Sequence, residues 1–157
     1  MRDITYYLGK KLVLNRFLYL FLNLTWGLLT TLVGYLVLIV LLPFGKVRKH
    51  NGILYLAFKH KSRSYYGWGF SIGMVFFTYT AEPDRKLMDH EYGHTVQNAI
   101  FGPLMPFIVL IPSGIRFWYR RIFKIKTPYD SIWFEETATS IGDFYYSFAL
   151  FKKFLGE

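Results

Sequence analysis

One uncharged apolar run, covering residues 17–45, dominates the N-terminal half of the chain. A helix needs about 20 apolar residues to cross the core of a bilayer, so this run is long enough with some tilt. A signal peptide would have a shorter apolar region and a small-residue cleavage site, and no such site is visible. The pattern predicts a transmembrane helix over residues 17–45, with a buried core helix as the alternative. Asn23, Gly27 and Gly34 would permit a bend or a re-entrant hairpin.

Two shorter apolar segments follow, at residues 53–58 and 69–79. Both are rich in aromatic and β-branched residues, and a polar stretch separates them. This composition is typical of strands, and it predicts a β-hairpin formed by the two segments. Gly67, Gly69 and Gly73 indicate a bulged or closely approached edge, where the backbone could meet a ligand.

The C-terminal half predicts two longer helices. The first should begin near Glu82-Pro83-Asp84, because proline suits the first helical turn and acidic residues favour its positive end. It should end before Gly102-Pro103, and the second helix should cover residues 131–154. Residues 95–115 are uncharged but contain three prolines, which argue against a straight spanning helix. A re-entrant segment and an ordinary core segment are both compatible with that pattern.

These elements together predict an α+β fold with one small core, because 157 residues leave no room for a second. Residues 1–45 would form a basic lead-in and the transmembrane helix. Residues 46–157 would form the second part of the chain, with a small β-hairpin or sheet, the helix that begins near residue 82 and a C-terminal helix. An aromatic and basic cluster at residues 116–121 is typical of a membrane interface.

The net charge is +9, and basic residues cluster on both sides of the apolar run. Such clusters usually contact anionic lipid headgroups on the cytoplasmic side of a membrane. Nucleic acid is the other partner that a basic chain suggests, but no nucleic-acid motif is present and the charges follow no helix stripe. We therefore expect membrane lipid and no nucleic acid. The residues are Arg2, Lys10, Lys11 and Arg16 before the run, and Lys46, Arg48, Lys49, Lys59, Lys61 and Arg63 after it.

The sequence His90-Glu91-Tyr92-Gly93-His94 is an HExxH motif. Helical residues four apart share a face, so both imidazoles can bind one metal ion, and Glu91 can polarise a bound water. The chain has no cysteine, so any metal must be held by histidine and carboxylate. The motif predicts a zinc site with His90 and His94 as ligands. Gly93 is expected to keep the helix thin where a strand or substrate approaches.

A third ligand is expected because catalytic zinc usually has three protein ligands and an open position. Residues 133–143 place carboxylates in an otherwise apolar helix, and a buried carboxylate is costly unless it is paired or bound to a metal. Two histidines, His50 and His60, lie in basic, loop-like surroundings and are interpreted as surface residues. All candidates for the third ligand are His50, His60, Asp130, Glu135, Glu136 and Asp143.

The HExxH motif followed by Glu135-Glu136-Thr137-Ala138-Thr139 resembles the gluzincin metallopeptidases, whose second helix carries a Glu-x-x-Ala-Asp element. The resemblance implies that residues 46–157 are a minimal zincin-like catalytic domain with membrane-associated segments. In this domain Glu135 would be the third zinc ligand, with Glu136 as the fallback. It also implies a zinc metallopeptidase that acts on a peptide or protein substrate, with Glu91 as general base. Thr139 replaces the aspartate of the element, and Asp143 could take over its orienting hydrogen bond.

A second resemblance, over roughly residues 70–143, is to a group of small, uncharacterised bacterial membrane proteins. It rests on residues 73–77, on 90–97, on Phe101-Gly102-Pro103 and on Ile111-Pro112-Ser113. This resemblance implies a bacterial inner membrane location, and the excess of basic residues after the apolar run places the catalytic part on the cytoplasmic side. It brings no known substrate.

The expected reaction is hydrolysis by a zinc-activated water, with Glu91 as general base and then acid. The segment 71–79 would bind an extended substrate by edge pairing. Tyr129, Tyr145 and Tyr146 are candidates to stabilise the oxyanion. Two other functions stay open. One is a site-2-type intramembrane protease with Asp143 as third ligand, and the other is a non-catalytic membrane structural or interaction protein with a vestigial metal site.

Overall fold

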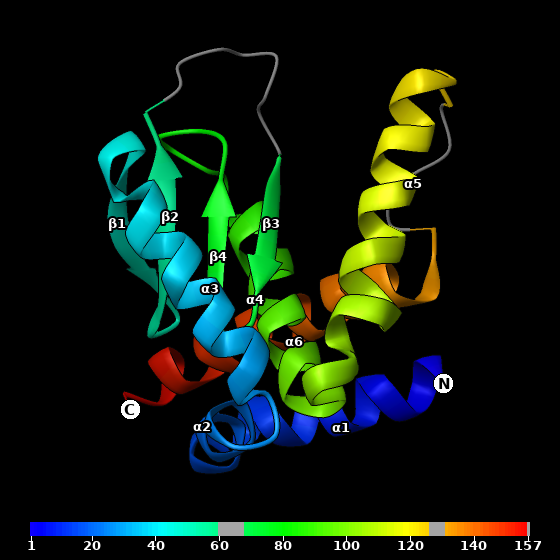
Figure 1. The fold of residues 1–157 in the computed structure, drawn as a ribbon. Helices are drawn as coiled ribbons and strands as arrows, with labels where there is room; N and C mark the ends of the chain where they lie inside the picture. Colours follow the sequence, from blue (N-terminus) through cyan, green and yellow to red (C-terminus); the bar gives the residue numbers. More distant parts are fainter. Residues whose placement is uncertain (60–67, 126–130, 157) are drawn as a thin grey trace.

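A four-stranded mixed sheet forms the centre of the molecule, with one helix on one face and the other helices of the core on the opposite face (Figure 1). The computed structural model describes residues 1–59, 68–125 and 131–156, and its α+β architecture confirms the predicted fold class. The strands are β1 (Gly45–His50), β2 (Ile53–Phe58), β3 (Gly69–Ile72) and β4 (Val75–Thr78). The helices are α1 (Arg2–Leu14), α2 (Arg16–Leu24), α3 (Leu28–Leu41), α4 (Arg85–Phe101), α5 (Ile111–Ile122) and α6 (Trp133–Leu155).

The sheet has the order β1-β2-β4-β3, so β1 and β3 are its edge strands. β1 pairs antiparallel with β2, β3 pairs antiparallel with β4, and β2 and β4 are parallel. The hairpin predicted between residues 53–58 and 69–79 is therefore wrong, because each segment belongs to a different hairpin. Asn51 and Gly52 form the first turn, both with positive φ, and Gly73 with φ of 60° forms part of the second.

The alternation of side chains along β2 and β4 builds a core on each face of the sheet. On one face, Leu56 and Phe77 pack against Leu38 of α3. On the other face, Phe76 belongs to a larger cluster to which α4 and α6 contribute. Leu12, Val13 and Tyr19 from the N-terminal helices are buried in this same cluster, so residues 1–45 and 46–157 share one core.

The apolar run at residues 17–45 is not a single helix. It forms α2 and α3, whose axes meet at 84°, and a short 3₁₀ turn at Leu42–Phe44. In the part of the chain that the structure describes, no single helix is long and apolar enough to cross a membrane. Two bent pairs meet the criteria of length and composition together, namely Arg16–Leu24 with Leu28–Phe44, and Arg85–Leu104 with Pro106–Ile122. The predicted N-terminal transmembrane helix is therefore not supported.

Buried polar side chains explain why this run bends. The Asn98 side chain on α4 donates to Asn23 Oδ1 (2.7 Å) and accepts from Thr30 Oγ1 (2.5 Å), so it joins α2 to α3. Asn23 and Asn98 are fully buried. A buried amide is costly unless it is hydrogen-bonded, and these bonds form only where α2 and α3 both fold against α4.

Helices α4 and α6 confirm the two helices predicted in the C-terminal half. Asp84 caps α4 by accepting a hydrogen bond from the Leu87 backbone N–H (2.7 Å), and Gly102 with φ of 54° ends it. The two helices cross very closely, because a Cβ on Gly93 would lie 2.1 Å from the carbonyl oxygen of Ala138. The element that approaches Gly93 is therefore α6, and not the strand or substrate expected from the sequence. This crossing brings the first turn of α6 to the HExxH motif.

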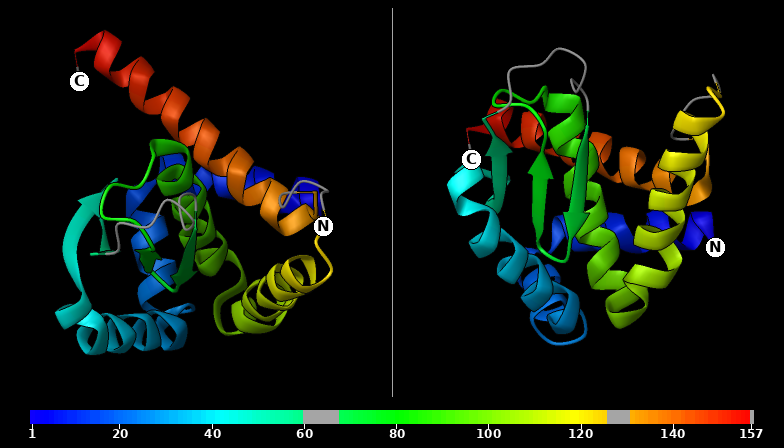
Figure 2. Two further views of the ribbon diagram at one scale, coloured as in Figure 1. Left: turned by 90° about the horizontal axis from the view of Figure 1, so that it is seen from above. Right: turned by 45° about the horizontal axis from the view of Figure 1, so that its top comes forward.

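After α4 the chain turns sharply and returns as α5. A 3₁₀ turn at Gly102–Leu104 and a π-helical turn at Pro106–Leu110 precede α5, and the bend between the two helical arms is 114°. Proline lacks the backbone donor of a regular helix, so the prolines account for the interruption. As a result α5 stands apart from the sheet, on the side of β3 (Figures 1 and 2).

Candidate metal centre

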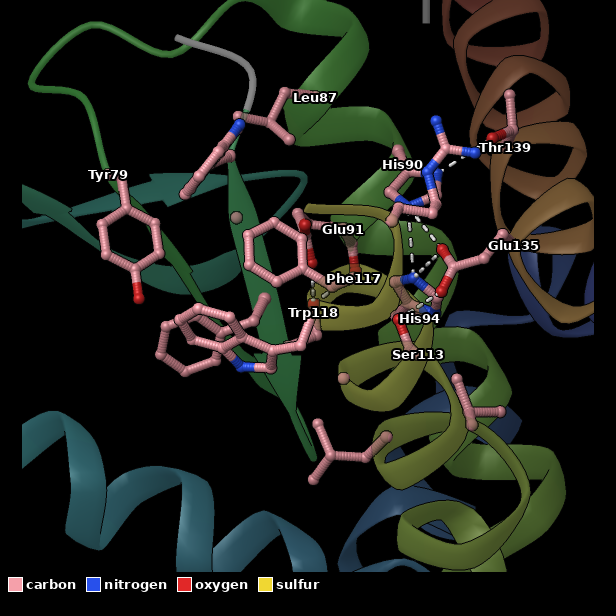
Figure 3. Close-up of a pocket in the computed structure, with 18 of the residues that line it drawn as sticks. Tyr79, Leu87, His90, Glu91, His94, Ser113, Phe117, Trp118, Glu135 and Thr139 are labelled. Atoms are coloured by element: carbon pink, nitrogen blue, oxygen red, sulfur yellow. Dashed lines mark hydrogen bonds and ion pairs between the residues drawn. The ribbon is translucent and has the colours of Figure 1, made fainter. Parts of the chain in front are cut away.

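Three side chains with metal-binding atoms converge between α4 and α6. The Nε2 atoms of His90 and His94 lie 3.2 Å apart, and Glu135 Oε2 lies 3.2 Å from the first and 3.1 Å from the second (Figure 3). The histidines are one helical turn apart on α4, and Glu135 comes from the first turn of α6. Among the described residues, no other three such side chains come so close together.

The size of this triangle fits a metal ion. Zinc forms bonds of about 2.0 Å to nitrogen and oxygen, so neighbouring ligands of a tetrahedral ion lie about 3.3 Å apart. The three observed distances of 3.1–3.2 Å are close to that value. Two imidazoles and one carboxylate also leave a fourth position open, as catalytic zinc sites do.

The hydrogen bonds around His94 fix which of its nitrogens carries the proton. Gln97 Nε2 donates to the backbone carbonyl of Phe134 (2.6 Å), so Gln97 Oε1 is the atom that faces His94 Nδ1 at 2.8 Å. Nδ1 must then be protonated, and in a neutral imidazole the Nε2 lone pair points at the Glu135 carboxylate. A lone pair 3.1 Å from a carboxylate oxygen is unfavourable unless a proton or a metal ion lies between them.

Each ligand has one side chain that orients it. Gln97 holds His94, Thr139 Oγ1 lies 2.9 Å from His90 Nδ1, and Ser113 on α5 donates to Glu135 Oε1. The side chain that orients His90 is therefore Thr139. Asp143, which was expected to provide that hydrogen bond, is exposed. The sequence analysis included Gln97 and Ser113 in the second resemblance but gave them no role, although Gln97 follows His94 by three residues and so shares its helix face.

The other candidate ligands lie elsewhere or outside the described residues. His50 is mostly buried and binds Asp89 (2.7 Å), so its interpretation as a surface residue is wrong. Glu136 is exposed and pairs with Arg2 at 3.2 Å. Asp143 is exposed and is not part of the triangle. His60, Asp130 and Tyr129 lie outside the described residues.

Burial and neighbouring opposite charges shift the pKa values of the candidate ligands in opposite directions. Burial disfavours a charged His94, but the Glu135 and Glu91 carboxylates and the Gln97 hydrogen bond together outweigh it and raise the pKa of His94 to about 9. Burial likewise disfavours a charged Glu135, but His94 and His90 hold the pKa of Glu135 well below its usual range. Glu135 therefore stays ionised although its side chain is fully buried, and such a carboxylate attracts a cation.

Glu91 lies beside the triangle, with its carboxylate held by the edge strand β3. Glu91 Oε2 accepts a hydrogen bond from Ser71 Oγ at 2.6 Å. A Cβ on Gly69 would lie 2.6 Å from Glu91 Oε1, so the absence of a side chain there leaves room for the carboxylate. Burial raises the pKa of Glu91 above its ordinary value, while His94, His90 and the Ser71 hydroxyl oppose that rise.

A pocket of about 1080 Å³ lies over these residues, between β3 and α5 (Figure 3). Aromatic and aliphatic side chains form much of its wall, and basic side chains also line it. Tyr145 and Tyr146, the predicted oxyanion donors, are not among the lining residues. Tyr145 packs against Tyr92, with ring centroids 4.7 Å apart, and the guanidinium of Arg85 lies 3.6 Å from the Tyr146 ring. The aromatic and basic lining residues are Trp68, Phe70, Tyr79, Phe117, Trp118, Lys86, Arg120 and Arg121.

No protein-family model, curated protein or solved structure matches this chain. The fold and the site define an α+β protein with a possible metal centre made of two histidines and a glutamate.

Proposed function

We propose that this protein is a zinc-dependent metallopeptidase, in which His90, His94 and Glu135 bind the metal and Glu91 is the general base. The observation that carries the proposal is the triangle of two imidazole nitrogens and one carboxylate oxygen with sides of 3.1–3.2 Å. Glu91 faces the same pocket from the same helix, which is the arrangement that hydrolysis requires.

Zinc bound in such a site lowers the pKa of a water molecule and polarises the carbonyl group of a substrate. The protein's contribution is to fix the ligands before the metal arrives. Gln97 and Thr139 hold the two imidazole rings, and Ser113 holds the Glu135 carboxylate from the opposite wall of the pocket. Ligands fixed in this way lose little freedom when they bind, so the affinity for the metal increases.

Glu91 is suited to move a proton between the attacking water and the leaving amine. Its pKa is raised by burial, and a general base works best when its pKa approaches the working pH. Ser71 binds Oε2, which leaves Oε1 to accept the proton from the water and then return it to the amine nitrogen.

An extended peptide is the substrate that best fits the pocket. β3 is an edge strand that lines the pocket, so its backbone can pair with a peptide strand. β4 lies inside the sheet, between β2 and β3, so the edge expected over residues 71–79 is limited to β3. The aromatic and aliphatic side chains of the wall favour a bulky apolar side chain in the substrate. A site-2-type protease with Asp143 as ligand has no support, since Asp143 is exposed.

Metal analysis of purified variants tests the ligand set. Wild-type protein should contain about one zinc ion per chain, and Glu135→Gln should lose most of it because a neutral amide is a poor zinc ligand. Elemental analysis by mass spectrometry measures both. Glu136→Gln is the matched control, since it makes the same change at an exposed neighbour on the same helix and should keep its zinc. Wild-type protein without metal, or zinc lost from Asp143→Asn alone, would contradict the proposal.

The pH dependence of hydrolysis tests the role of Ser71. The Ser71 hydroxyl stabilises the charged form of Glu91, so Ser71→Ala should raise the pKa of Glu91 further. Glu91 acts as a base only when ionised, so the acidic limb of the kcat/KM profile should move to higher pH. The measurement is kcat/KM against pH for wild-type and variant protein. An acidic limb that stays in place would show that Ser71 does not control this group.

A further inference from the structure

The outer face of α3 is an exposed apolar stripe. Leu29, Leu32, Leu36 and Ile39 follow each other at helical spacing and are each more than half exposed. The opposite side of α3 is covered, with Leu38 buried against the sheet. A helix on the surface of a water-soluble protein carries polar residues on its outer face, and α3 has no charged residue at all.

The helical segment that contains α5 has a second such stripe, on the side away from the pocket. Ser113 and Phe117 line the pocket. Ile115 and Ile122 do not line the pocket and are about two-thirds exposed. They lie seven residues apart, which places them on one face of α5, two helical turns from each other. One segment therefore forms a wall of the candidate active site and also presents apolar side chains outward.

The two stripes belong to helices that both lie away from the C-terminal half of α6. The view from above shows this, with the start of α6 next to α5, whereas in Figure 1 α3 and α5 lie on either side of β3 (Figures 1 and 2). A soluble monomer rarely exposes two apolar stripes of this length. We therefore expect another molecule or a membrane to cover the outer faces of both helices.

The charges around the two stripes indicate the charge of the surface that covers them. The chain has no acidic residue between Asp3 and Glu82, nor between Glu91 and Asp130. These intervals contain α2, α3, the whole sheet and α5, so every formal charge on these elements is positive. Exposed basic residues that do not line the pocket follow both stripes, Lys46 and Lys49 after α3, and Lys124 after α5. A second copy of the chain docked here would bring like charges together, whereas an anionic surface would complement them.

We propose that the outer faces of α3 and α5 insert into an anionic lipid bilayer. Insertion of two helix faces replaces the single membrane span expected from the sequence. Because α5 has one face in the pocket and the other in lipid, the pocket lies about one helix diameter, roughly 10 Å, from the bilayer. This inference is independent of the proposed hydrolysis, since it rests on surface side chains that the candidate site does not use.

Fluorescent labels on single cysteines test the proposal, because the natural chain has no cysteine. Leu36→Cys and Ile115→Cys are labelled with an environment-sensitive dye, and Asp143→Cys on α6 is the control. Each full-length protein is mixed with vesicles of phosphatidylcholine and phosphatidylglycerol. The first two labels should shift to shorter emission wavelength and be quenched by spin-labelled lipid, and the control should change little. Vesicles of phosphatidylcholine alone should give a smaller shift.

Several results would overturn the proposal. Labels on α3 and α5 that respond no more than the label at Asp143 would show that these faces do not enter lipid. An emission shift that appears without vesicles and grows with protein concentration would assign the face to a second copy of the chain. Every variant keeps Glu91 and the three candidate ligands, so the outcome does not depend on whether the protein hydrolyses peptides.

Discussion

Glu91→Gln should lower kcat/KM for peptide hydrolysis by about 1000-fold, within the range typical of a lost general base. Glutamine has nearly the same shape as glutamate and can still accept the hydrogen bond from Ser71, but it cannot take up a proton from water. The ligands His90, His94 and Glu135 are unchanged, so the zinc content should stay at the wild-type level. Kinetics and metal analysis on the same preparation measure both effects.

The control for this prediction is Glu82→Gln, which makes the same chemical change at an exposed residue outside the pocket. It should keep both activity and zinc. If Glu91→Gln hydrolyses peptides as fast as the wild type, Glu91 is not the base. If wild-type protein binds zinc but cleaves no peptide or other acyl substrate, the non-catalytic interpretation of the metal site gains support instead.

The arrangement of Glu91 and the candidate ligands could be predicted because most of it is local. His90, Glu91 and His94 share one helix, and the helical repeat alone sets how their side chains project. Glu135 is distant in the sequence. The carboxylates in the apolar helix suggested that one of them meets a cation, but the choice of Glu135 over Glu136 and Asp143 rested on the gluzincin resemblance. The side chains that orient the candidate ligands could not be predicted in this way. Ser113 reaches Glu135 only because the chain between α4 and α5 bends by 114°, and no local pattern contains that angle.

The two errors in the fold have different causes, because tertiary contacts outweighed the local pattern in the first and local turn signals were not used in the second. The run at residues 17–45 is apolar enough for one long helix, yet the hydrogen bonds from Asn98 to Asn23 and Thr30 favour two. The segment at residues 69–79 resembles one strand, yet Gly73 turns it back on itself. Asn51-Gly52 was a local signal for a tight turn that the sequence analysis did not use.

Gly93→Ala should destabilise the protein by about 3 kcal/mol or more, which corresponds to a fall in Tm of roughly 10 °C for a chain of this size. The added Cβ would lie 2.1 Å from the carbonyl oxygen of Ala138, 2.7 Å from its carbonyl carbon and 2.9 Å from its Cα. All three are backbone atoms, so no side chain can rotate away and α6 must move outward. Since α6 carries Glu135 and α4 carries both histidines, the same movement should weaken zinc binding.

Gly114→Ala separates this effect from the general consequence of replacing a helical glycine. A Cβ at Gly114 in α5 meets nothing within 4 Å, and alanine favours a helix over glycine by about 1 kcal/mol, so this variant should unfold at the same or a slightly higher temperature. Thermal unfolding of both variants, with zinc content measured alongside, makes the comparison. Equal changes in Tm would mean that the α4–α6 crossing tolerates a side chain. A large loss of stability and zinc in Gly93→Ala alone would identify this crossing as the contact that holds Glu135 against the two histidines.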